Sequence, residues 1–150
     1  MPQSLAKVYV HTVFSTKNRE PLLHDGWRDE FFAVIGGAVN HIGCQSLVVG
    51  GVADHVHLLF QLSRTITIAD AVGRIKTASA AWVNQTHPTP IPFHWQAGYG
   101  MFSIGYAQVE GLRAYIRGQP EHHRTVSFQD ELRAWLARYE LEWNEDYVWD

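Results

Sequence analysis

The order of strand-like and helix-like segments is the feature that most constrains how this 150-residue chain can fold. Runs rich in β-branched and aromatic residues predict strands over residues 7–15, 45–52, 55–62 and 100–104. Apolar residues at helical spacing predict helices over residues 27–41 and from Thr67 to about Asn84. The order strand–helix–strand–strand–helix–strand is the split βαβ, or ferredoxin-like, plan. We therefore predict an α+β fold, with an antiparallel sheet, helices packed on one face, and added C-terminal helices.

Two of these added helices follow the fourth strand. The first covers residues 108–118, and the second begins at Ser127 and continues to Tyr139. The one clear irregular loop, residues 85–98, contains three of the chain's six prolines. Because no repeat, low-complexity tract or interdomain linker is present, residues 1–150 are expected to form a single domain.

Composition indicates a folded, globular chain. Hydrophobic residues make up 46% of the sequence, which includes six tryptophans, and no apolar run is long enough to span a membrane. The N-terminus reads as a strand and not as a signal peptide. The single cysteine, Cys44, excludes an internal disulfide and is typical of a reducing compartment. We therefore expect a cytoplasmic protein with no membrane partner.

The charge is unevenly distributed, although the net value is only −3. Residues 125–150 contain two arginines and seven carboxylates, whereas residues 64–124 contain six basic and three acidic residues. A basic middle segment permits contacts with phosphate groups. Charge alone therefore allows nucleic-acid binding without predicting it.

The first candidate for chemistry is the segment His55-Val56-His57. Side chains two residues apart on a strand project from the same face, so both imidazoles are expected to lie side by side. Two neutral imidazoles at this spacing can hold one divalent cation. A strand pair with ordinary hydrogen bonds is the competing interpretation of this motif seen alone.

The second candidate is Tyr115 with Gln119, four residues apart on a predicted helix and therefore on one face. Tyr115 offers a phenol that can act as a nucleophile, and Gln119 offers a neutral oxygen as a third metal ligand. Gly118 and Pro120 flank Gln119 and both disfavour a continuous helix, so Gln119 is expected near a frayed end. Taken alone, Tyr115 is better interpreted as a core or interface aromatic residue on an amphipathic helix.

The sequence around these pairs resembles a known family. The segments VYVHTVFSTKNREPLL, GGVADHVHLLF, GYGMFSIG, VEGLRAYIRGQPEHHRTVSFQDEL and NEDYVWD are similar to the small transposases of the insertion sequence 200/605 group, including REP-associated tyrosine transposases. These are single-tyrosine members of the HUH nuclease superfamily. The family's histidine–hydrophobic–histidine motif is His55-Val56-His57 here, and its tyrosine and glutamine correspond to Tyr115 and Gln119.

The resemblance implies a DNA transposase that cuts and rejoins single-stranded DNA carrying imperfect hairpins, through a 5′-phosphotyrosine and with Mg²⁺ or Mn²⁺. It implies Tyr115 as the catalytic nucleophile and His55, His57 and Gln119 as the metal ligands. It also implies a homodimer, in which the histidines of one subunit commonly meet the tyrosine helix of the other.

Six further residues are candidates for nucleic-acid contacts: Lys17, Arg19, Arg74, Lys76, His122 and His123. Adjacent side chains diverge on regular structure, so the two histidines favour contacts in a loop or with phosphate over a second metal site. Two other functions stay open. One is a domesticated regulator that binds hairpin DNA or RNA with little or no cleavage, and the other is a metal-dependent hydrolase in which Tyr115 is only structural.

Overall fold

The computed structural model describes residues 2–123 and 125–150 of the chain. Its four strands are β1 (Tyr9–Ser15), β2 (Gln45–Gly51), β3 (His55–Gln61) and β4 (Gly100–Ile104). Its helices are α1 (Asp25–His41), α2 (Ile68–Thr86), α3 (Val109–Arg117), α4 (Gln119–His122) and α5 (Phe128–Arg138), with short 3₁₀ turns η1 (Lys17–Arg19) and η2 (Tyr106–Gln108). The predicted strands and main helices are all present, within about two residues at each end for the strands.

The strands form one sheet in the order β2-β3-β1-β4, and all three neighbouring pairs are antiparallel. This order confirms the predicted split βαβ plan. Strand β3 is central, and its residue His57 lies opposite Val13 of β1 and opposite Gly50 of β2. Any side chain on β3 is therefore flanked by both neighbouring strands.

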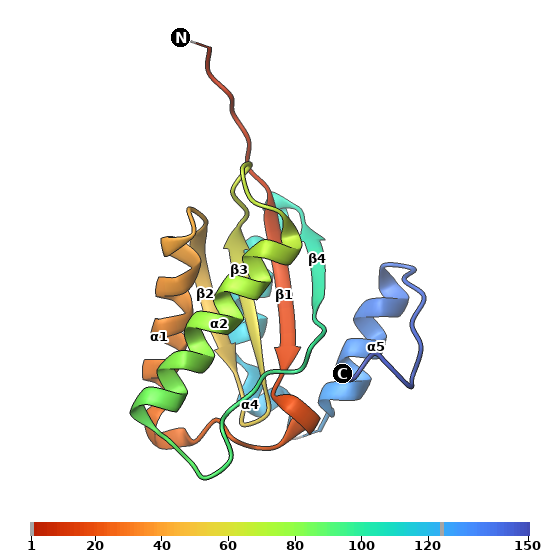
Figure 1. Ribbon diagram of the computed structural model, residues 1–150. Helices are drawn as coiled ribbons and strands as arrows, with labels where there is room; N and C mark the ends of the chain where they lie inside the picture. The colour runs from red at the N-terminus through yellow and green to blue at the C-terminus, as the bar shows by residue number, and fades with distance from the viewer. Residues whose placement is uncertain (1, 124) are drawn as a thin grey trace.

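Helices α1 and α2 lie together on one face of the sheet (Figure 1). They cover the strand residues that alternate to that side, and Phe14 and Phe60 are completely buried beneath them. Burial of such a side chain contributes about 1.5–3 kcal/mol to stability. This face is an ordinary apolar core, and the prediction that helices cover one face is confirmed for α1 and α2.

The C-terminal helices α3 and α5 pack on the opposite face. Helix α3 lies against β2 and β3 through Leu112 and Ile116, and α5 lies against β1 and β4 through Phe128 and Leu132. Figure 1 shows α5 beside β4, set apart from the α1–α2 layer. Two separate small cores therefore hold two helices over one sheet face, and that face carries His55 and His57.

Local sequence accounts for the starts of α2 and α5, which both have side-chain caps. The hydroxyl of Thr67 accepts a hydrogen bond from the backbone of Asp70, and the hydroxyl of Ser127 accepts one from Asp130. Each cap provides a partner for an amide that would otherwise have none, which contributes about 1 kcal/mol. Within residues 2–123 and 125–150, no helix combines the length and the apolar character needed to cross a membrane.

Candidate metal and nucleophile site

His55 and His57 point from β3 toward the layer of α3 and α5, as the period of a strand predicts. Both side chains are fully buried. The Nδ1 atom of His55 donates a hydrogen bond of 2.7 Å to the carboxylate of Asp54, in the turn before the strand. This bond fixes the ring so that its Nε2 atom faces inward.

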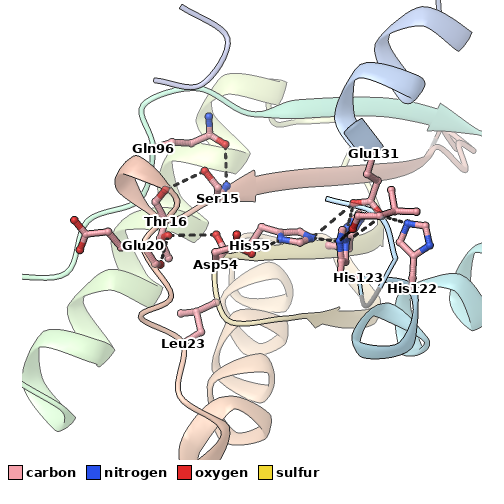
Figure 2. Close-up of polar contacts among 12 residues, drawn as sticks. Ser15, Thr16, Glu20, Leu23, Asp54, His55, Gln96, His122, His123 and Glu131 are labelled. Carbon is pink, nitrogen blue, oxygen red and sulfur yellow. Dashed lines mark hydrogen bonds and ion pairs between the residues drawn. The ribbon is translucent and has the colours of Figure 1, made fainter. Parts of the chain in front are cut away.

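Two residues from the C-terminal region complete a cluster with this pair (Figure 2). The Nε2 atom of His123 lies 2.9 Å from the Nε2 atom of His55. Glu131 of α5 accepts a hydrogen bond of 2.8 Å from the Nε2 atom of His57. The Oε1 atom of Glu131 also lies 3.6 Å from the Nε2 atom of His55. Segments separated by more than 60 residues therefore converge on one point.

The four side chains fit a divalent cation. Their candidate ligand atoms, three imidazole nitrogens and one carboxylate oxygen, all lie within 4.8 Å of one another. His123 donates from Nδ1 to the carbonyl of Val126 at 2.6 Å, as His55 does to Asp54, so both rings direct Nε2 to the centre. Metal-bound histidines are commonly held by such a bond from the other ring nitrogen.

Tyr115 reaches this cluster from α3 of the same chain. Its hydroxyl donates a hydrogen bond to the Oε2 atom of Glu131 and lies 3.2 Å from the Nε2 atom of His122. The same carboxylate therefore meets the histidine pair through Oε1 and the phenol through Oε2. His122 is also 2.9 Å from Oε2.

A glycine allows α3 to approach this closely. A Cβ atom on Gly50 would lie 2.7 Å from the carbonyl oxygen of Ile116, the residue after Tyr115. Since real Cβ atoms do not come this near a backbone oxygen, any larger residue at position 50 would push the helix away. The absence of a side chain on Gly50, opposite His57, thus allows α3 and its Tyr115 to lie close to the sheet.

Gln119 lies at the start of α4, because α3 ends at Arg117 and Gly118 caps it. The interruption that Gly118 and Pro120 predict is therefore present. The Gln119 side chain is fully buried, and its Nε2 atom donates to the carbonyl of Tyr115 at 3.4 Å. Its Oε1 atom has no hydrogen-bond partner among the described residues. A buried carbonyl oxygen without a partner is unusual, and this oxygen is free to accept a hydrogen bond or to bind a ligand.

The charges in the cluster are strongly coupled. Burial opposes ionisation of Glu131, but hydrogen bonds from His123, His55 and His57 outweigh it and hold its pKa well below the usual value. Burial lowers the pKa of His57 to about 4. Burial also opposes the charge on His55, yet hydrogen bonds to Asp54 and Glu131 raise its pKa overall. Glu131 is thus held in its anionic form, which favours positive charge at the centre of the cluster, as a proton on His55 or as a cation.

Burial raises the pKa of Tyr115, and the hydrogen bond to Glu131 and its negative charge raise it further. The phenol therefore keeps its proton in this structure. An anionic carboxylate beside a phenol opposes formation of the phenolate unless positive charge is added nearby.

The four predicted basic residues are not among the clustered candidate ligands, and three of them contact other groups of the protein. Lys76 donates to the carbonyls of Gln96, Ala97 and Gly98, and burial lowers its pKa to about 8. Arg74 pairs with Asp70 at 3.2 Å, Arg19 lies over the ring of Trp149, and Lys17 lies in η1. These contacts hold local structure, and a role in DNA binding stays a prediction.

The two adjacent histidines do not diverge as the sequence suggested. His123 joins the candidate metal ligands, and His122 contacts Tyr115, because the chain leaves regular helix at the end of α4. Both Nε2 atoms therefore reach Oε2 of Glu131, at 2.9 and 3.3 Å. Phosphate contacts by these two residues stay a prediction.

Glu131 is not among the site residues predicted from the sequence, although the sequence contains a signal for it. Glu131 is 4% exposed and lies among the apolar positions of α5, three residues after Phe128 and four before Trp135. A carboxylate within an apolar helix stripe indicates a buried partner, since unpaired carboxylates are almost never fully buried.

The fold and the site together define a class of protein in which a histidine pair on a sheet and a tyrosine on a helix share one centre. Residues 4–119 match the family model described as "Transposase IS200 like". The chain belongs to this family of IS200-like transposases. A comparison with curated proteins found no match.

Two solved structures share the fold. One is a candidate transposase from Deinococcus radiodurans R1, with a TM-score of 0.64 and 23% identity over 79% of this chain and 98% of that one. The other is a REP-associated tyrosine transposase bound to a REP hairpin, with a TM-score of 0.60 and 14% identity over 84% of this chain and 74% of that one. At these identities the likeness concerns the fold.

The match to the family model ends at residue 119, before His123 and Glu131. Two of the four clustered candidate ligands therefore come from the segment beyond it.

Proposed function

We propose that this protein is a transposase that cuts and rejoins single-stranded DNA by metal-assisted transesterification, with Tyr115 as the nucleophile. The observation that carries the proposal is the hydrogen bond from the Tyr115 hydroxyl to Glu131, whose other oxygen faces His55 and His57. A nucleophile and a cation-binding cluster joined by one carboxylate suit attack on a phosphate. Membership of the IS200-like family supports the same reaction.

In the proposed reaction the Tyr115 oxygen bonds to phosphorus, and the bond from phosphorus to the 3′-oxygen of the preceding nucleotide breaks. The phenol gives up its proton to water, since the lowered pKa of Glu131 makes that carboxylate a poor base, and the departing 3′-oxygen takes a proton from water. The product is a 5′-phosphotyrosine and a free 3′-hydroxyl. A second 3′-hydroxyl reverses these steps and joins a new strand.

We propose His55, His57, His123 and Glu131 as ligands of the cation, with Oε1 of Gln119 as a further ligand. A bound divalent cation would neutralise charge on the phosphate and favour departure of the 3′-oxygen. Of the two metals considered, three imidazoles favour Mn²⁺, because Mg²⁺ prefers oxygen ligands and retains several waters.

The proposed substrate is DNA that carries a hairpin. A REP-associated tyrosine transposase with the same fold was solved bound to a REP hairpin, which supports this choice. A homodimer stays part of the proposal. Since Tyr115 contacts Glu131 within one chain, each subunit of such a dimer would contain its own site.

The test is formation of a covalent adduct. The protein is incubated with Mn²⁺ and a library of single-stranded oligonucleotides whose stem-loops and flanks are randomised, and adducts are separated under denaturing conditions. Wild type is expected to form an adduct that Tyr115→Phe abolishes. Tyr147→Phe is the matched control, because Tyr147 is 71% exposed and outside the cluster.

Each outcome decides between the functions considered. An adduct that persists in Tyr115→Phe would show that the nucleophile is another residue. If wild type binds the hairpin library but forms no adduct, the result favours a hairpin-binding regulator and overturns the transposase proposal. Hydrolysis of the DNA without any adduct would favour the metal-dependent hydrolase.

A further inference from the structure

A hollow of about 580 Å³ opens between α3 and α5 directly beside the candidate site. Tyr115, His122 and Glu131 are among the residues that line it. Its volume lies in the range of sites that bind small molecules, and a nucleotide is of this size. Nothing in the proposed cutting reaction by itself requires this space.

The walls of the hollow are mainly aromatic and apolar. Trp135 and Tyr139 are half-buried, with rings stacked at 27° and centroids 6.1 Å apart. Leu112 contributes an apolar surface from α3. The guanidinium of Arg138 lies over the Trp135 ring, 4.9 Å from its centroid, and brings one positive charge to a lining that also contains the carboxylates of Asp130 and Glu131. Planar rings beside a cation suit a planar base attached to a phosphate.

The position of the hollow narrows the choice of ligand. The centroids of Tyr115 and Trp135 are 6.3 Å apart, so a group on Trp135 lies within one nucleotide of the phenol. Any phosphate attacked by Tyr115 has a base on each side, and one of them must lie near this wall. An unpaired base offers the flat face that such a wall accepts.

We propose that the hollow between α3 and α5 binds the base of an unpaired nucleotide next to the phosphate that is cut. It would therefore set the base preference of cleavage at that position. This inference rests on the proposed function, and it adds a specificity site that the nucleophile and metal ligands do not supply.

The chain offers a way to fill the hollow without disturbing the fold. Gly111 lines it from α3, and a Cβ atom built there meets no atom within 4 Å. Leucine at this position would extend into the space that the base would occupy, and it also favours a helix more than glycine does. Gly37 of α1 is the matched control, since its Cβ is equally free and it lies on the other side of the sheet.

The experiment uses the randomised library described above and sequences the DNA in the adducts. Wild type is expected to select one base, or one class of base, at a single position adjacent to the cut. Gly111→Leu is expected to lose this selection and to form adducts about tenfold less efficiently, as loss of one stacked base predicts. Gly37→Leu should match wild type in both respects.

An abasic nucleotide provides the second measurement. Placed at the selected position, it should lower the adduct yield of wild type about tenfold. The adduct yield of Gly111→Leu should stay unchanged, because the leucine already prevents a base from binding in the hollow. Unchanged selection in Gly111→Leu would overturn the base site while the adduct itself still supports the proposed function. Absence of any wild-type adduct would overturn both.

Discussion

The Nε2 atom of His11 lies 2.7 Å from the Nδ1 atom of His57, and their rings stack at 18°. His11 is fully buried on β1, on the side of the sheet away from α1 and α2. A cation at Nε2 of His57 requires the proton on Nδ1, and His11 is placed to accept it. We therefore infer that His11 positions the proposed ligand His57, in the way that Asp54 positions His55.

Replacing His11 with leucine is expected to weaken Mn²⁺ binding about 10- to 100-fold, the usual effect of losing such a partner. His11→Gln keeps an acceptor and should recover part of the affinity. Calorimetric titration measures both variants, with thermal unfolding as a check on folding. Equal affinity in His11→Leu and wild type would contradict the assignment.

The carboxylate of Glu131 is expected to matter by its charge more than by its size. Glu131→Gln keeps the shape but removes the negative charge that faces three histidines, so we expect Mn²⁺ affinity to fall by about tenfold or more. The adduct should form correspondingly slowly. Glu142→Gln, an exposed position outside the cluster, is the control. A variant that binds Mn²⁺ as wild type does would remove Glu131 from the ligand set.

A methyl group at position 50 is expected to separate the tyrosine helix from the sheet. Gly50→Ala should destabilise the protein by about 1–3 kcal/mol, because the new Cβ meets the backbone of Ile116 at 2.7 Å. Adduct formation should fall further than stability alone explains. Urea denaturation measures the stability, with Gly37→Ala as the unobstructed control. A fully stable Gly50→Ala would show that α3 adapts.

Mixing two inactive variants distinguishes a site within one chain from a site shared between chains. Since Tyr115 and the histidines meet within one chain, a mixture of Tyr115→Phe and His57→Ala is expected to stay inactive. Recovery of the adduct on mixing would show that the tyrosine of one subunit works with the histidines of another. Co-expression of the two variants allows mixed dimers, with one subunit of each variant, to form during synthesis.

Acid is expected to loosen the last residues of the chain. Hydrogen bonds from Arg133, Trp143 and Trp149 lower the pKa of Glu145 from 4.5 to about 2. The stability from these contacts is present above pH 4.5 and is lost as the pH falls toward 2. Near-ultraviolet circular dichroism should report this change at the tryptophans. Glu145→Gln should show no transition in that range, and an identical transition in both proteins would contradict the assignment.

The sheet was predictable because its signals are local. The alternation from His55 to Leu62 specifies which side chains share a face, and the order of elements specifies the split βαβ plan. Gly118 and Pro120 likewise mark the end of α3 from the sequence alone. Such features depend on neighbours within a few residues.

The full cluster was not predictable in the same way. His123 and Glu131 reach the site because α5 packs on β1 and β4, a contact between distant segments that no local period encodes. Whether these two residues reach the histidine pair depends on which face of the sheet the C-terminal helices cover. Either face of a sheet can accept an amphipathic helix. The one sequence signal for this packing is the carboxylate of Glu131 within the apolar stripe of α5.

The small separate core beneath α5 has a consequence for engineering. Phe128, Leu132 and Leu136 attach this helix to the sheet without contributing to the larger core under α1 and α2. Grafting a different helix onto the same anchor positions would change the carboxylate and the aromatic wall together, while the histidine strand stays intact. Under the proposed function, exchange of the 11 residues of α5 would change the base preference of cleavage.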